Sequence, residues 1–224
     1  MAETYPHPKM TFGQWVANVW YYHKWMILFG AVVVFGIVIA SAQFFSRVEP
    51  DASILYVGPR VISEQRCEEI TGTTEALMQT DPNGDGKKKI EIRTVTLSTQ
   101  YASLIGNERP GQTEYDAYMD YQNEVLAGDA CLLLLDPLFY GQLEEDGALM
   151  PLSDAIGSVP EGAKKCGIAL EDLLLYRRDG FSALAPETLL CFRYASAYSV
   201  PDEDERMKLQ NEALAVFRDL INAG

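Results

Sequence analysis

The sequence predicts an α/β domain behind one amino-terminal transmembrane helix. Two observations lead to this fold class. The stretch between Lys24 and Arg47 carries no charged residue and is long enough to cross a bilayer. From residue 53 onward, short apolar runs alternate with longer segments in which apolar residues recur every three or four positions. Such runs are typical of strands and such spacing of helices, so their alternation indicates one mostly parallel sheet flanked by helices.

The apolar stretch from Met26 to Phe45 is predicted to form the transmembrane helix, with the lipid bilayer as its partner. At about 1.5 Å per residue, a helix of this length reaches roughly 30 Å, the thickness of the hydrocarbon core. A cleaved signal peptide is the alternative, because Ala40-Ser41-Ala42 has the small-x-small form that signal peptidase accepts. The long aromatic segment before the stretch favours a retained anchor.

That aromatic segment is predicted to lie at the membrane interface. It holds Trp15, Trp20 and Trp25, the three Trp of the protein. Indole rings prefer the headgroup region, so the segment has the composition of an aromatic belt leading into the membrane. A helix that binds a partner protein is the alternative.

The charge distribution excludes one class of partner and suggests an orientation. The chain has 18 Lys and Arg against 32 Asp and Glu, a net charge of −14. A nucleic-acid binder needs a basic face, so nucleic acid is excluded as a partner. Lys9 and Lys24 precede the apolar stretch with only Glu3 to oppose them. This weak bias predicts a cytoplasmic amino terminus and an extracytoplasmic carboxyl-terminal domain.

The predicted organisation has four parts. They are a cytoplasmic and interfacial segment at residues 1–25, the transmembrane helix at 26–45, a linker at 46–52, and the extracytoplasmic α/β domain at 53–224.

Within the domain, the pattern predicts four strands and four helices. The expected strands are residues 53–57, 90–97, 130–135 and 188–194, and the expected helices are 63–80, 113–127, 138–145 and a last helix that Ser199 caps, with Pro201 in its first turn. The expected apolar face of the second helix consists of Tyr115, Tyr118, Met119, Gln122, Val125 and Leu126. The continuous apolar run at 130–135 is typical of a strand buried on both faces. Residues 153–185 give no clear pattern.

The stretch from Tyr115 to Leu152 resembles a segment of extracellular solute-binding proteins of the type II periplasmic fold. The resemblance rests on a helix ending in Ala127-Gly128-Asp129, a buried strand ending at Asp136, a short helix, and the sequence Gly-x-Leu-x-Pro-Leu from Gly147. The opening strand-helix-strand from Ser53 to Leu97 also fits the first lobe of that fold, and with it the resemblance covers about half of the chain. A full member of that family has two lobes, whereas this chain has room for one, so the resemblance implies a single lobe of that fold. The layout also resembles single-pass bacterial membrane proteins with a small extracytoplasmic α/β domain.

The carboxyl ends of the expected strands supply the candidate ligand-binding residues. Small molecules bind beyond these ends in open α/β sheets. The residues there are Gly58, Ser98 and Asp136, with Tyr140 shortly after. The alternative is that they form ordinary turns at the ends of strands.

The sequence Asp81-Pro-Asn83-Gly-Asp85-Gly matches the start of a calcium-binding loop. Oxygen ligands stand at positions 1, 3 and 5, and Gly at position 6. Position 12, which usually supplies a bidentate Glu, is Ile92, and three Lys follow the loop directly. We therefore expect weak calcium binding at most and no other cofactor, and a plain polar turn is the alternative.

Catalytic and redox motifs are sparse. His7 and His23 both precede the domain, so it can hold neither a His-dependent triad nor a His-based zinc site. The four Cys contain no CxxC motif. Two disulfides in any of three pairings are allowed, but the apolar surroundings of most of these Cys favour buried thiols.

The sequence therefore predicts a membrane-anchored extracytoplasmic binding or interaction module without catalysis. Its partner would be a membrane or surface protein or a small ligand. Two alternatives remain. One is a secreted or surface small-ligand binding protein that serves a transporter, although no lipobox Cys follows the apolar stretch. The other is an enzyme that depends on carboxylates or on a metal.

Overall fold

The structure is a computed structural model that describes residues 11–45, 49–97, 112–128 and 130–223. The chain divides into two units, Met1–Arg47 and Val48–Gly224. Candidate residue Ser98 lies outside the described residues.

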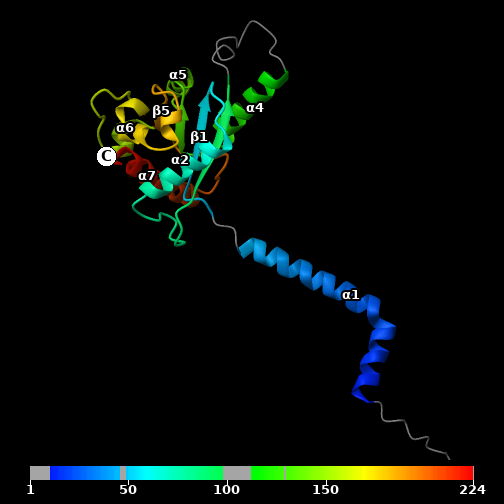
Figure 1. Ribbon diagram of the computed structural model, residues 1–224. Helices are drawn as coiled ribbons and strands as arrows, with labels where there is room; N and C mark the ends of the chain where they lie inside the picture. Colours follow the sequence, from blue (N-terminus) through cyan, green and yellow to red (C-terminus); the bar gives the residue numbers. More distant parts are fainter. Residues whose placement is uncertain (1–10, 46–48, 98–111, 129, 224) are drawn as a thin grey trace, which may run out of the picture. The chain divides into compact units, whose positions relative to one another are not determined.

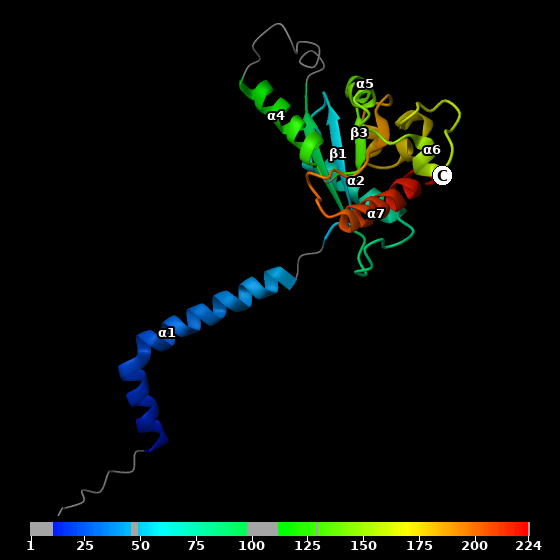
Figure 2. The same ribbon diagram turned by 180° about the vertical axis from the view of Figure 1, so that it is seen from behind.

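The first unit contains one long helix, α1 (Phe12–Phe45). Its residues Phe12–Ser41 are long and apolar enough to cross a membrane, and the side chains of its most apolar window are not buried by protein. This span includes most of the stretch 26–45 that the sequence predicted as the transmembrane helix. A bend separates a shorter amino-terminal part of α1 from a longer carboxyl-terminal part (Figures 1 and 2). The aromatic segment and the apolar stretch thus form one continuous helix.

The second unit is built on a five-stranded sheet with the order β2-β1-β3-β5-β4. The strands are β1 (Ala52–Gly58), β2 (Ile90–Thr96), β3 (Leu132–Leu135), β4 (Gly167–Ala169) and β5 (Leu189–Phe192). Strand β1 pairs in parallel with β2 and β3, whereas β5 pairs antiparallel with both β3 and β4.

The sheet is therefore mixed, whereas the sequence predicted a mostly parallel one. The difference arises where the sequence pattern was unclear. A parallel neighbour needs a crossover, usually through an α-helix. Between β4 and β5 the chain forms only the 3₁₀ helices η1 (Leu170–Asp172), η2 (Leu174–Arg177) and η3 (Phe181–Ala183). They return the chain without a crossover, so β4 and β5 run in opposite directions.

Helices cover both faces of this sheet, which gives an α/β fold of three layers (Figures 1 and 2). On one face, α2 (Glu64–Leu77), α6 (Leu152–Ile156) and α7 (Glu203–Ile221) pack with the 3₁₀ helices. On the other face lie α4 (Gln112–Ala127) and α5 (Pro137–Glu145). As the sequence predicted, β3 is buried on both faces, and so is β1.

The two crossovers from β1 to β3 fix the place where a ligand site is expected. The β1-α2-β2 connection and the β2-α4-β3 connection run in opposite directions along the sheet. Right-handed crossovers therefore put α2 and α4 on opposite faces. The chain then leaves β1 towards α2 on one face and leaves β3 towards α5 on the other. The carboxyl ends of β1 and β3 thus flank the topological switch point of the sheet.

Two details of the helices differ from the sequence prediction. Asp202, not Ser199, caps α7, because the Asp202 carboxylate accepts a hydrogen bond of 2.9 Å from the Glu205 N–H. The Ser199 hydroxyl instead donates to the carbonyls of Gly128 and Ser196. The buried face of α4 is also rotated from the expected one, since Tyr121 is buried and Tyr115 is exposed.

Candidate functional site

The structure brings Gly58 and Asp136 together at the switch point. The Asp136 N–H donates to the carbonyl of Val57 at 2.9 Å, and the Leu97 N–H donates to the carbonyl of Gly58 at 3.0 Å. The Asp136 carboxylate accepts from the Leu138 N–H at 3.0 Å and so caps α5, with Pro137 in the first turn. The structural role of the Asp136 carboxylate is therefore to cap the start of α5.

Gly58 is needed for a side chain that the sequence did not single out. Tyr56 is buried, and a Cβ at residue 58 would collide with its hydroxyl oxygen and lie 2.7 Å from its Cζ. Burial raises the pKa of the Tyr56 phenol, the Asp136 carboxylate adds to the rise, and a hydrogen bond with the Arg60 backbone opposes it. The switch point thus holds a neutral phenol beside a carboxylate.

Tyr140 has a different task. Its buried hydroxyl donates to Glu144 at 2.6 Å and accepts from the Cys166 N–H at 3.3 Å. The Lys164 ammonium lies 4.7 Å from the centre of its ring. Burial, and then the bond to Glu144, raises the pKa of this phenol. Tyr140 therefore ties α5 to the start of β4 and has no polar atom to spare for the switch point.

The loop at residues 81–86 closes on itself. The Asp81 carboxylate accepts from the N–H groups of Gly84 and Gly86 at 3.0 and 2.6 Å. Likewise, the side-chain Oδ1 of Asn83 accepts from the Asp85 N–H, and the Asp85 carboxylate accepts from the Lys87 N–H. Gly84 and Gly86 have φ angles of 76° and 82°, which favour glycine. This hydrogen bonding is that of a polar turn.

A buried carboxylate anchors this turn to the sheet. Asp51 accepts from the N–H groups of Asn83 and Lys89 at 3.3 and 2.8 Å. Sequence reasoning missed Asp51, which directly precedes β1. Among the described residues, no group of three or more His, Cys, Asp or Glu is placed to hold a metal ion.

A groove of about 310 Å³ lies between α4 and α5, away from the predicted site residues. Its wall consists of Tyr118, Tyr121, Gln122 and Val125 from α4, and Gln142, Leu143, Glu145 and Asp146 from α5 and its end. The rings of Tyr118 and Tyr121 lie 6.2 Å apart, and the Tyr121 ring lies 5.5 Å from that of Phe139 in α5. Gln122 donates from its amide to the Tyr118 hydroxyl at 2.8 Å.

Tyr121 is the buried residue of this groove, with 4% of its surface exposed. In the part of the chain that the structure describes, its hydroxyl has no hydrogen-bond partner. Burial, and then the charge of Asp146, raises the pKa of its phenol to about 12. A sequence signal for this groove existed in the spacing of Ala117, Tyr121 and Val125, four residues apart.

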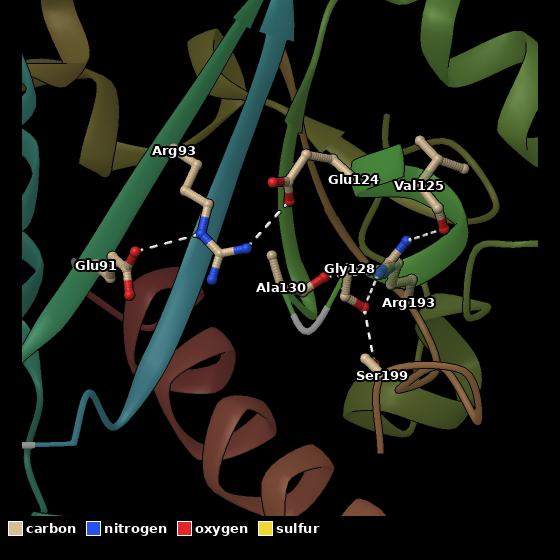
Figure 3. Close-up of polar contacts among 8 residues, drawn as sticks. All are labelled: Glu91, Arg93, Glu124, Val125, Gly128, Ala130, Arg193 and Ser199. Atoms are coloured by element: carbon tan, nitrogen blue, oxygen red, sulfur yellow. Dashed lines mark hydrogen bonds and ion pairs between the residues drawn. The ribbon is translucent and has the colours of Figure 1, made fainter. Parts of the chain in front are cut away.

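The carboxyl-terminal end of α4 is held by a buried arginine (Figure 3). Arg193 donates from Nε to the carbonyl of Ala130 at 2.8 Å, from Nη1 to that of Val125 at 2.7 Å, and from Nη2 to that of Gly128. A guanidinium at a helix carboxyl terminus also opposes the negative end of the helix dipole. On the neighbouring side, Arg93 of β2 forms ion pairs with Glu91 at 3.2 Å and Glu124 at 3.1 Å. These contacts fix the α4 wall of the groove.

No family model matches this chain, and no curated protein and no solved structure matches it at a significant level. Its function is therefore inferred from its own geometry.

Proposed function

We propose that this chain is a single-pass membrane protein whose α/β domain acts outside the cytoplasm as a binding or interaction module. The observation that carries the anchor is α1, whose apolar side chains are not covered by protein. Phe29, Val32 and Phe35 are all exposed. An apolar surface of this extent is not stable in water, and lipid is the environment that would cover it.

The groove between α4 and α5 supports binding as the task of the domain. It is a preformed concave site with polar groups around apolar side chains, the kind of site that binds small ligands or single side chains. By contrast, Asp136 caps a helix and Tyr140 is bonded twice. Both groups serve the fold, which favours binding over catalysis.

The charge distribution supports the proposed orientation. Two Lys precede the apolar stretch, and nearly all acidic residues follow it. Under the positive-inside rule, the Lys residues before the stretch favour a cytoplasmic amino terminus.

A small-ligand binding protein related to one lobe of the solute-binding proteins is the second candidate. The observation that favours it is the switch point between β1 and β3, where Gly58 and Asp136 are adjacent. Ligands of doubly wound sheets bind at such points. In this second candidate the ligand lies beyond these strand ends, not in the groove.

Labelling of single cysteines in intact cells tests the location. Val61 is 83% exposed and lies between β1 and α2, so Val61→Cys in a Cys67→Ser background presents one accessible thiol in the domain. We expect a membrane-impermeant maleimide to label it in intact cells. Thr4→Cys in the same background is the matched control and should react only after the membrane is permeabilised.

The reverse pattern, with Thr4→Cys labelled first, would contradict the proposed orientation. Recovery of the chain in the soluble fraction after carbonate extraction would contradict the anchor itself.

A further inference from the structure

We propose that the groove between α4 and α5 binds an organic cation that carries N–H donors, either a primary ammonium or a guanidinium group. This assignment rests on the proposed function of the domain as a binding module and names the chemistry of its ligand. It is carried by the charge at the rim of the groove, a buried hydroxyl and two aromatic rings.

Charge at the rim selects a cation. Glu145 is the last residue of α5 and Asp146 is its C-cap, and both are exposed and line the groove. Carboxylates at this end of a helix lie beside the negative end of the helix dipole, which is unfavourable. Neither carboxylate forms an ion pair with any described residue. A bound cation would offset both the two charges and the dipole.

The buried hydroxyl of Tyr121 indicates a ligand that forms hydrogen bonds. A buried hydroxyl without a partner destabilises a fold, and most buried polar groups therefore have one. Tyr121 lines the groove, and the negative charge of Asp146 adds to the rise in the pKa of its phenol. An N–H of a bound cation can donate to this oxygen. The Oε1 atom of Gln122 is a second acceptor, since its amide nitrogen is used by Tyr118.

Aromatic side chains distinguish an organic cation from a metal ion. A hard metal ion needs several oxygen ligands around it, whereas this wall offers the rings of Tyr118 and Tyr121. Ammonium and guanidinium groups are attracted to the faces of such rings. The volume of about 310 Å³ lies at the small end of ligand pockets, which suits a single cationic group on a short chain.

Such a group has two sources, a free amine or guanidine and the side chain of a Lys or Arg in a peptide. Binding is measured by calorimetry on the full-length chain in lipid nanodiscs. The probes are n-butylguanidinium, n-butylammonium and a blocked Gly-Arg-Gly peptide. Uncharged n-butanol and anionic butyrate serve as controls of the same length. The source is the one whose probe binds more tightly.

Three variants locate the binding. Tyr121→Phe keeps the ring and removes the hydroxyl, and Glu145→Gln with Asp146→Asn removes both rim charges. We expect each to weaken cation binding about tenfold, because each removes a contact to a charged ligand. Glu203→Gln with Asp204→Asn makes the same charge change in the first turn of α7. We expect that control to alter affinity by less than about twofold, since exposed charges distant from the ligand are screened. Circular dichroism confirms that each variant is folded.

Equal binding of n-butanol and the cations would overturn the proposal. Equal loss of affinity in the α7 control and in the groove variants would also overturn it. So would the absence of cation binding up to about 10 mM, because binding that weak is not selective. These results are independent of the cysteine labelling. A groove that binds no cation would not contradict the membrane anchor. A chain with the opposite orientation could still bind the probes.

Discussion

The guanidinium group of Arg193 lies against Gly128, in the space that a larger residue at position 128 would need. A Cβ there would lie 2.7 Å from Arg193 Nη2 and would collide with the carbonyl oxygen of Glu124. The same guanidinium donates to the Gly128 carbonyl. The glycine and the arginine therefore require each other, and together they join the end of α4 to the strand β5.

Gly128→Ala should destabilise the domain. One of the colliding atoms belongs to the backbone of α4, so the helix end must shift to admit a methyl group. We expect the free energy of unfolding to fall by about 1–3 kcal/mol. Gly72→Ala is the matched control, because it lies within α2 with open space around it and should raise stability by about 0.5–1 kcal/mol. Urea unfolding followed by circular dichroism measures both. Equal effects at the two positions would contradict the role of Gly128.

Arg193→Lys should also be destabilising, although the charge is kept. Three carbonyl oxygens, those of Val125, Gly128 and Ala130, accept from a guanidinium that is fixed and planar. One ammonium cannot reach all three, so we expect a loss of about 2–4 kcal/mol. Arg66→Lys, on the surface of α2, should change the free energy of unfolding by less than about 0.5 kcal/mol. An unchanged free energy of unfolding in Arg193→Lys would contradict this role and would mean that water replaces the guanidinium at no cost.

Two buried tyrosines should differ in how much stability they lose when the hydroxyl is removed. Tyr140 uses its hydroxyl twice, so Tyr140→Phe should cost about 1–3 kcal/mol of unfolding free energy. No described residue forms a hydrogen bond with the Tyr121 hydroxyl, so Tyr121→Phe should cost less than about 1 kcal/mol or stabilise the fold. Denaturant titrations at neutral pH compare the two. A larger loss for Tyr121→Phe than for Tyr140→Phe would refute this assignment.

The Tyr121 hydroxyl should also leave a signature at high pH. Its pKa rises from 10.0 to about 12 on folding. The unfolded chain therefore releases the phenol proton at a lower pH than the folded chain. The contribution of Tyr121 to folding stability is complete below pH 10 and is lost as the pH rises towards 12. Tyr121→Phe removes this contribution, so its stability should fall less steeply than that of the wild type over the same range. Parallel slopes would show that the Tyr121 pKa is the same in both states.

Calcium should bind to the loop at residues 81–86 only at millimolar concentration. The oxygens of Asp81, Asn83 and Asp85 already accept loop N–H groups, and Ile92 stands where a bidentate Glu is usual. A loop that lacks this ligand falls at or beyond the weak end of extracellular calcium sites, on the order of 1 mM. A thermal shift with calcium measures the affinity, and Asp81→Asn with Asp85→Asn is the control. Micromolar binding would show that another carboxylate completes the site.

The apolar stretch should be retained in the mature protein. We expect the intact mass of the protein purified from the membrane fraction to include residues 26–45. Ala42→Leu, which blocks any cleavage by signal peptidase, should then change the mass only by the substitution itself. A wild-type protein that begins at Gln43 would show that the stretch is a signal peptide.

The sequence predicted those parts of the fold that have a local signal. Strand β3 is a continuous apolar run and α1 is uncharged for over twenty residues, so both could be located directly. Strand β4 spans only Gly167–Ala169, which is too short to show any period. Its antiparallel pairing, and hence the mixed sheet, could not be predicted.

The site was harder to predict for a different reason. Helix α4 carries aromatic residues at positions 115, 118 and 121, so its apolar face was ambiguous, and the expected face was one position out. The adjacency of Gly58 and Asp136 followed from a rule about strand ends. No such rule predicts the groove, because its two walls come from separate helices. How close these helices lie depends on their packing against the whole sheet.

The buried cysteines of this domain can report local opening of the sheet. Cys131, Cys166 and Cys191 are buried as thiols at or next to β3, β4 and β5. An alkylating reagent reaches such a thiol only when the strand around it separates from its neighbours, so each reaction rate counts how often that separation occurs. The central β3 and the edge strand β4 can thus be compared within one molecule, without any added label. If the domain resides where disulfides form, the same protection keeps three thiols unoxidised for as long as the sheet stays closed.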